Sequence, residues 1–95
     1  MRNLQITEHF MDRVEERFEF ITELEGLSYE ELAAPALTAT KRGVLPNGDT
    51  FYVVTLNNIT YGLGYRMNGE EVVITTALTP YMIDQNYEWG TISAI

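Results

Sequence analysis

The sequence predicts an α+β domain in which N-terminal helices pack on an antiparallel β-meander of three to five strands. Residues 8–23 repeat apolar side chains at helical spacing, and residues 50–78 alternate strand-forming runs with short turns. Ninety-five residues, 45% of them hydrophobic, are enough to close one modest core. We therefore expect residues 1–95 to form a single domain.

The first helix is predicted to run from Thr7 to about Glu23, after a short strand at residues 4–6. Thr7 is the expected N-cap, because its side-chain oxygen can accept a hydrogen bond from a backbone N–H of the first turn. Apolar residues then recur three or four positions apart, so one face can pack on a sheet. These residues are Phe10, Met11, Val14, Phe18, Ile21 and Leu24. Gly26 should follow the end of this helix.

A second, shorter helix is expected from Ser28, because Ser28 and Glu31 have the S-x-x-E spacing of a capping box. Pro35 should end that helix after Ala34. Residues 37–42 suit either a strand or a continuation of the helix, and both alternatives stay open.

Three strands are predicted over residues 50–56, 59–66 and 72–78. Tight turns precede and join them, at Pro46-Asn47-Gly48-Asp49, Asn57-Asn58 and Asn68-Gly69. Turns this short connect antiparallel neighbours. Gly62 and Gly64 interrupt the middle strand on one face, which indicates a bulge or a close approach by the packed helix.

The remaining tail, residues 80–95, is too aromatic for a flexible end. We expect it to pack on the domain, and the segment from Thr91 is a candidate edge strand.

The composition excludes several classes of site. The chain has no cysteine, so it can form neither a disulfide nor a thiolate metal site. We expect no cofactor and no metal, because a single histidine leaves at best a carboxylate-rich cation site. The N-terminus lacks a signal-peptide core, and no apolar run approaches the roughly 18 residues that a membrane span needs. We therefore expect a cytoplasmic protein that does not bind membranes.

The formal net charge of -8 argues against a general nucleic-acid binder, because nonspecific affinity for phosphate is mainly cationic. Nine of the fourteen carboxylates lie within residues 8–31, so the helical side presents an acidic face that could steer a basic partner. A solvated helix surface is the simpler interpretation. Any RNA chemistry requires a local basic pocket.

The candidate catalytic residues start from the only histidine. His9, Arg13 and Arg17 are spaced four apart and follow one side of the first helix, beside its apolar stripe. An imidazole can act as general acid or base at neutral pH, and an arginine can stabilise the charge that develops in RNA transesterification. The simpler alternative is that Arg13 pairs with Glu16, while Arg17 reaches solvent or another element.

The run Ile-Thr-Glu-His-Phe-Met-Asp-Arg-Val-Glu-Glu-Arg at residues 6–17 resembles the opening of small toxin and phage proteins. These proteins belong to the barnase, EndoU, colicin and RelE nuclease superfamily, and the resemblance is to its BrnT-like members in particular. Their first helix often reads H-x-x-x-R-x-x-x-R. The order of elements is similar over about residues 4–79: a helix, a short helix and a curved antiparallel sheet.

The resemblance implies a metal-independent ribonuclease-like domain, as one half of a toxin–antitoxin pair or as a phage effector. Its partners would be RNA and a protein, either an antitoxin or a host or defence protein. His9 would be the general acid/base, Arg13 or Arg17 the phosphate clamp, and Thr75 or Thr76 a polar contact at the end of the final strand.

Further binding residues are candidates from their chemistry. Lys41, Arg42 and Arg66 could supply a positive rim if the sheet curls around the helix, although exposed basic residues beside a sheet more often serve solubility. Tyr65 could stack on a base, although a strand tyrosine is more often half-buried packing.

The alternative function is a non-catalytic binding module, such as a phage inhibitor, whose acidic helix occupies a basic surface of a partner protein. Its contact residues would be Asp12, Glu15, Glu16, Glu19 and Glu23.

Overall fold

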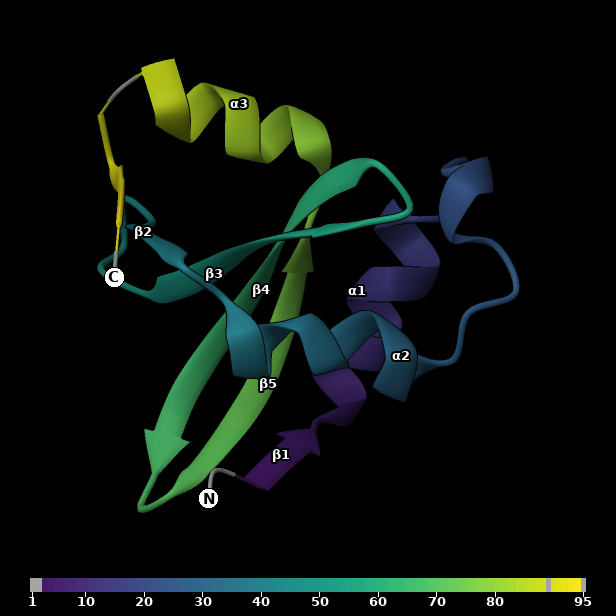
Figure 1. Ribbon diagram of the computed structural model, residues 1–95, viewed down its shortest axis with the longest axis horizontal. Helices are drawn as coiled ribbons and strands as arrows, with labels where there is room; N and C mark the ends of the chain where they lie inside the picture. Colours follow the sequence, from purple (N-terminus) through teal and green to yellow (C-terminus); the bar gives the residue numbers. More distant parts are fainter. Residues whose placement is uncertain (1–2, 89, 95) are drawn as a thin grey trace.

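The computed structural model describes residues 3–88 and 90–94, which form an α+β fold around one six-stranded sheet (Figure 1). The elements in chain order are β1 (Asn3–Ile6), α1 (Glu8–Arg17), the 3₁₀ helix η1 (Thr22–Leu24), α2 (Tyr29–Ala33), the 3₁₀ helix η2 (Ala34–Thr38), β2 (Lys41–Val44), β3 (Thr50–Leu56), β4 (Ile59–Asn68), β5 (Glu71–Leu78), α3 (Pro80–Glu88) and β6 (Ile92–Ala94). The predicted fold class is confirmed.

The sheet differs from the predicted meander in two respects. It has six strands rather than three to five, in the order β1-β5-β4-β3-β2-β6. The first strand runs parallel to β5, whereas the other neighbouring strands are antiparallel. A parallel pair is possible here because β1 and β5 are joined through the helices and the whole meander, not through a tight turn.

Helix α1 begins as predicted but ends early. The Thr7 side chain accepts a hydrogen bond from the Phe10 N–H at 3.1 Å, so Thr7 is the N-cap. The helix ends at Arg17 rather than near Glu23, because four of the next five residues are aromatic or β-branched and form helix poorly. The turn that follows exposes 87% of Phe20.

The main core lies between one face of the sheet and the helices α1 and α2, and it contains the predicted apolar stripe (Figure 1). Its buried α1 side chains, together with Phe18, contact β4 and β5. Tyr61 is fully buried there, with its ring edge-on to Phe18 at 5.4 Å. Its hydroxyl donates to the carbonyl of Leu32 at 2.6 Å, which ties α2 to β4.

The second helix has the predicted capping box, in which Ser28 and Glu31 each bond the other's backbone N–H. Pro35 does not end the helical path. It lies in the first turn of η2, where the N–H that proline lacks has no helical partner. Of the two alternatives for residues 37–42, helix holds as far as Thr38, and the strand starts at Lys41.

The predicted strands of the meander are confirmed, with β4 extended to Asn68 and β5 starting at Glu71. A bulge or a close approach by the packed helix was expected at the glycines, and one of these is seen at each of them, although the helix over Gly62 is the unpredicted α3. The register shifts between Gly64 and Tyr65, which is a bulge. Gly62 lies under α3, where an added Cβ would be 2.7 Å from Ile83 Cδ1.

The C-terminal segment packs, as predicted, but as a helix followed by a strand. Helix α3 covers the sheet face opposite α1 and α2 (Figure 1), over a second core of Phe51, Val53, Leu78 and Ile83. The edge strand β6 begins at Ile92 and pairs with β2. Trp89 lies outside the described residues. No helix in the described ranges is long and apolar enough to cross a membrane.

Replacing Tyr61 by phenylalanine should destabilise the fold by about 1–3 kcal/mol near neutral pH, because the buried Leu32 carbonyl loses its donor. Chemical denaturation measures this loss. Tyr29→Phe is the matched control: it removes an exposed hydroxyl bond to Glu15 and should cost less.

Burial also raises the pKa of Tyr61 well above its ordinary value. The unfolded phenol ionises near pH 10, while the folded one stays neutral. The wild-type protein therefore loses stability as the pH rises above about 10, and Tyr61→Phe lacks this loss. The difference in the free energy of unfolding between wild type and Tyr61→Phe should therefore become smaller at high pH. A constant gap would contradict this account of the buried hydroxyl.

Candidate functional site

Strand β1 covers only the first half of β5, and this leaves room for a site. Residues Asn3–Ile6 pair with Glu71–Ile74. The Thr7 backbone N–H and hydroxyl then both donate to the Ile74 carbonyl, at 3.2 and 3.0 Å, and the chain turns into α1. The second half of β5 therefore has a helix beside its edge instead of a strand.

A cleft of about 430 Å³ lies beside this part of β5. Its lining comes from α1, β5, α3 and the loop between β2 and β3. The residues are His9, Arg13, Arg17, Leu45, Asn47, Asp49, Thr75, Thr76, Leu78 and Met82. The structure thus brings together in one cleft all five residues that the sequence nominates as catalytic.

The bulge explains how both threonines reach the cleft. Tyr65 pairs with Ile74 and Gly64 with Thr76, so Thr75 is the additional residue of β5. In a regular strand, neighbouring side chains point to opposite faces. Here a Cβ added to Gly64 would meet Thr76 Cγ2 at 2.3 Å and Thr75 Oγ1 at 3.5 Å. Both threonines therefore lie over Gly64, in the space that its missing side chain leaves.

The two arginines are each held by one hydrogen bond. Arg13 Nη1 donates to Glu16 Oε2 at 2.6 Å, which is the i, i+3 pair that the simpler interpretation predicted. Arg17 Nη1 reaches the carbonyl of Ala77 at 2.8 Å, so it does bridge to another element. A guanidinium has several N–H donors, and one bond leaves others for a ligand.

The surroundings of Arg17 disfavour its charged form. Partial burial lowers its pKa, the charge of Arg13 lowers it further, and Glu16 opposes both effects. The two guanidiniums are thus close enough to repel each other. An anion between them would reduce this repulsion.

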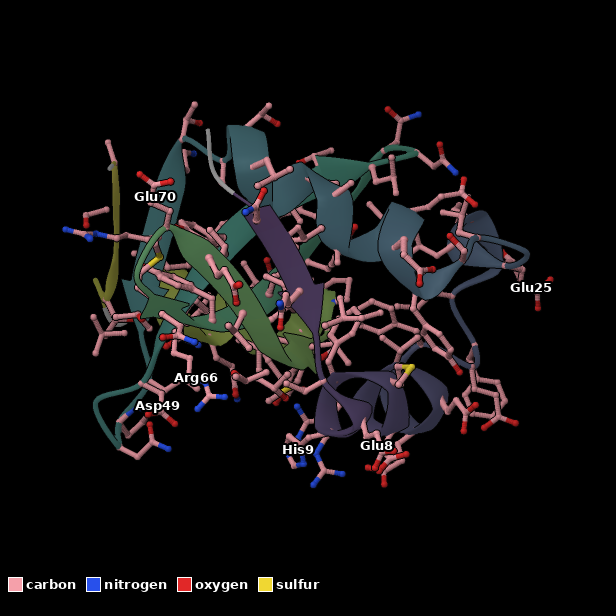
Figure 2. The ribbon with its side chains drawn as sticks, turned by 90° about the horizontal axis from the view of Figure 1, so that it is seen from below. Glu8, His9, Glu25, Asp49, Arg66 and Glu70 are labelled. Carbon is pink, nitrogen blue, oxygen red and sulfur yellow. The ribbon has the colours of Figure 1, made fainter. Side chains whose placement is uncertain are left out.

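His9 is the exposed member of the set. Its side chain makes no hydrogen bond to another residue within the described ranges. In Figure 2 it projects outward from the start of α1, on the same side of the molecule as Asp49 and Arg66. The imidazole is therefore available to a ligand and to solvent.

The side chains of the cleft suit an anion better than a cation. Asp49 is the one carboxylate among the lining residues, and it is held by Asn47: Asn47 Nδ2 donates to Asp49 Oδ2 at 3.0 Å. Over the described residues, no three histidine, aspartate or glutamate side chains are grouped as metal ligands would be.

Most of the other nominated binding residues lie elsewhere. Lys41 lines a separate cavity between η2 and β3. Arg42 is opposite Tyr52, on the face that α1 and α2 cover. Tyr65 stacks on Tyr52 at 3.9 Å, with the rings 9° from parallel, so it packs against the core instead of facing the cleft.

Sequence reasoning did not identify the opposite wall of the cleft. Asn47 and Asp49 belong to a segment interpreted only as a turn, and that role is real: the Asp49 N–H donates to Asn47 Oδ1 at 3.0 Å. Met82 belongs to an unpredicted helix. No short-range pattern places either segment next to α1, because their proximity depends on the folded sheet.

Replacing Gly64 by alanine should destabilise the protein by about 1–3 kcal/mol, because the new Cβ would overlap the Thr76 methyl. Thr76→Ser removes that methyl, so the Gly64→Ala penalty should shrink in the serine background. A double-mutant cycle by denaturation measures this coupling. Additive effects would show that the two side chains do not compete for the same space.

No protein-family model matches this chain, and neither a curated protein nor a solved structure matches it.

Proposed function

We propose that this chain is a small metal-independent ribonuclease-like domain, with His9 as general acid/base and with Arg13 and Arg17 on the scissile phosphate. One observation carries the proposal. In a chain of net charge -8, the only imidazole and two of the six basic residues line one cleft with two threonine hydroxyls. Such a concentration of donors is what an acidic protein needs to hold a phosphodiester.

The proposed step is an internal transesterification of RNA. The ribose 2′-oxygen forms a bond to phosphorus, the bond from phosphorus to the 5′-oxygen breaks, and a cyclic phosphate results. One proton leaves the 2′-hydroxyl and one is delivered to the departing 5′-oxygen. A single imidazole performs one of these transfers at a time, and the exposed position of His9 lets water exchange its proton.

The guanidiniums stabilise the charge that develops on the phosphoryl oxygens. Arg17 is anchored to Ala77 and Arg13 to Glu16, so neither side chain has to be ordered fully when the substrate binds. In the free protein, burial and then the charge of Arg13 lower the pKa of Arg17, and a bound phosphate offsets the repulsion between the two guanidiniums. Thr75 and Thr76 supply hydroxyl donors from the floor of the cleft.

The order of elements also supports the proposal. The resemblance to BrnT-like proteins depends on a helix, a short helix and an antiparallel sheet, and α1, α2 and β2–β5 follow this order. The biological setting, a toxin–antitoxin pair or a phage effector in the cytoplasm, belongs to the same proposal.

His9→Ala should lower the cleavage rate of a fluorogenic single-stranded RNA by about 100-fold or more, in buffer that contains EDTA. Folding should be unaffected, because the side chain is exposed and unbonded within the described residues. Glu8→Ala, at the neighbouring exposed position, is the matched control and should keep the wild-type rate. Equal cleavage by wild type and His9→Ala would remove His9 from the mechanism.

The alternative, an acidic module that binds a basic protein surface, is favoured by a different observation. Phe20 is 87% exposed and lies near Glu19 and Glu23 in the chain. Exposed aromatic side chains commonly anchor protein interfaces, and surrounding charges accelerate association with a complementary surface. Two of the nominated carboxylates are engaged internally, Glu15 by Tyr29 and Glu16 by Arg13.

If this alternative holds, a protein retained on the immobilised domain should be lost from Phe20→Ser and weakened by charge reversal at Glu19. Added salt should weaken the complex as well. Tyr81→Ser is the matched control, since Tyr81 is 69% exposed on α3. Retention by all variants, insensitive to salt, would argue against a partner site at this turn.

A further inference from the structure

The surface next to the cleft carries one more cation. Arg66 is two residues beyond Gly64 on β4, and residues two apart in a strand share a face. The missing side chain of Gly64 points at Thr76, which lines the cleft. Arg66 therefore lies on the cleft side of the sheet, about 7 Å further along the strand. Figure 2 shows it on the same side as His9 and Asp49.

Arg66 differs from the arginines of the cleft in its contacts. Arg13 is bound to Glu16 and Arg17 to Ala77. Arg66 is exposed and has no hydrogen bond or ion pair with any other residue in the part of the chain that the structure describes. Its guanidinium is free to take an anion from solution.

The surface between the cleft and Arg66 has no obstructing side chain from β4. On this face β4 contributes Gly62, Gly64 and then Arg66, so no β4 side chain stands between the threonines and the guanidinium. A ligand that fills the cleft can therefore continue along β4 toward Arg66.

We propose that Arg66 forms a second phosphate subsite, so that the substrate is single-stranded RNA of more than two nucleotides. This inference rests on the proposed ribonuclease function and names the substrate class of the same cleft. One phosphate lies at Arg13 and Arg17, and a neighbouring phosphate of the same strand lies at Arg66. A flexible single strand can bend into a cleft between a loop and a helix, whereas a duplex holds its phosphates on a stiff track.

Asp49 should limit how tightly RNA binds along the surface from the cleft to Arg66. Asp49 lines the cleft from the turn between β2 and β3, and Figure 2 shows its side chain on the same side of the molecule as Arg66. Its carboxylate repels phosphate. Asp49→Asn should therefore bind the same RNA more tightly, by a few-fold.

The first test compares kcat/KM for a dinucleotide, which has one phosphodiester, with that for a tetranucleotide. The wild-type protein should favour the longer substrate, and Arg66→Ala should reduce this ratio about tenfold. Arg42→Ala is the matched control, because Arg42 is an exposed arginine on the opposite face of the sheet. It should keep the wild-type ratio. An unchanged ratio in Arg66→Ala overturns the second subsite and leaves the proposed function intact.

A second test does not depend on cleavage. A tetranucleotide without 2′-hydroxyls cannot undergo the proposed step, but it offers the same phosphates. Loss of one phosphate contact in Arg66→Ala should reduce the slope of log Kd against log salt concentration by about 0.7 relative to wild type. Arg42→Ala should not change the slope. If the slope of Arg66→Ala equals that of wild type, Arg66 holds no phosphate, whether or not the protein cleaves RNA.

Discussion

The hydrogen bonds of Thr7 fix the geometry on which the rest of the molecule depends. Its hydroxyl donates to Ile74 at the edge of the sheet and accepts from the Phe10 N–H at the start of α1. One side chain therefore ends a strand, begins a helix and joins the two. Because the helix starts at that point, residues 9, 13 and 17 fall along the half of β5 that β1 does not cover.

The sheet face opposite α1 and α2 has a packed end and an open end, and both depend on glycines in β4, which have no side chain. At Gly62 the absence of a side chain lets Ile83 of α3 approach the strand, and that end of the face becomes a second core. At Gly64 the same absence makes room for the side chains of Thr75 and Thr76, and the face stays open as a cleft. Two glycines in one strand thus mark the boundary between the packed end of this face and the open cleft.

Short-range chemistry made much of the fold predictable. The Thr7 cap, the Ser28–Glu31 box and the tight turns each depend on residues a few positions apart, and all three were found. The parallel pairing of β1 and the position of α3 depend on contacts between distant segments, which no local pattern encodes. The end of α1 at Arg17 reflects weak helix formers that the apolar stripe concealed.

The candidate site was also predictable only in part, on the helix but not on the strands. Helical spacing was enough to group His9, Arg13 and Arg17. On the strands, the outcome depended on which face each residue occupies, and neighbouring residues face opposite ways. Tyr65 therefore packs on Tyr52, while Arg66 lies on the cleft side. The bulge places the neighbouring Thr75 and Thr76 on the same side, and the glycines of β4 did not indicate which residue of β5 would be the additional one.

The bond from Arg17 to Ala77 has a consequence for how the molecules behave in solution. Carbonyl groups along an uncovered strand edge can pair with a strand of another chain, and such pairing leads to aggregation. Arg17 occupies one of these carbonyls, and its charge discourages a second edge from approaching. The side chain that is proposed to bind phosphate thus also covers part of an exposed strand edge.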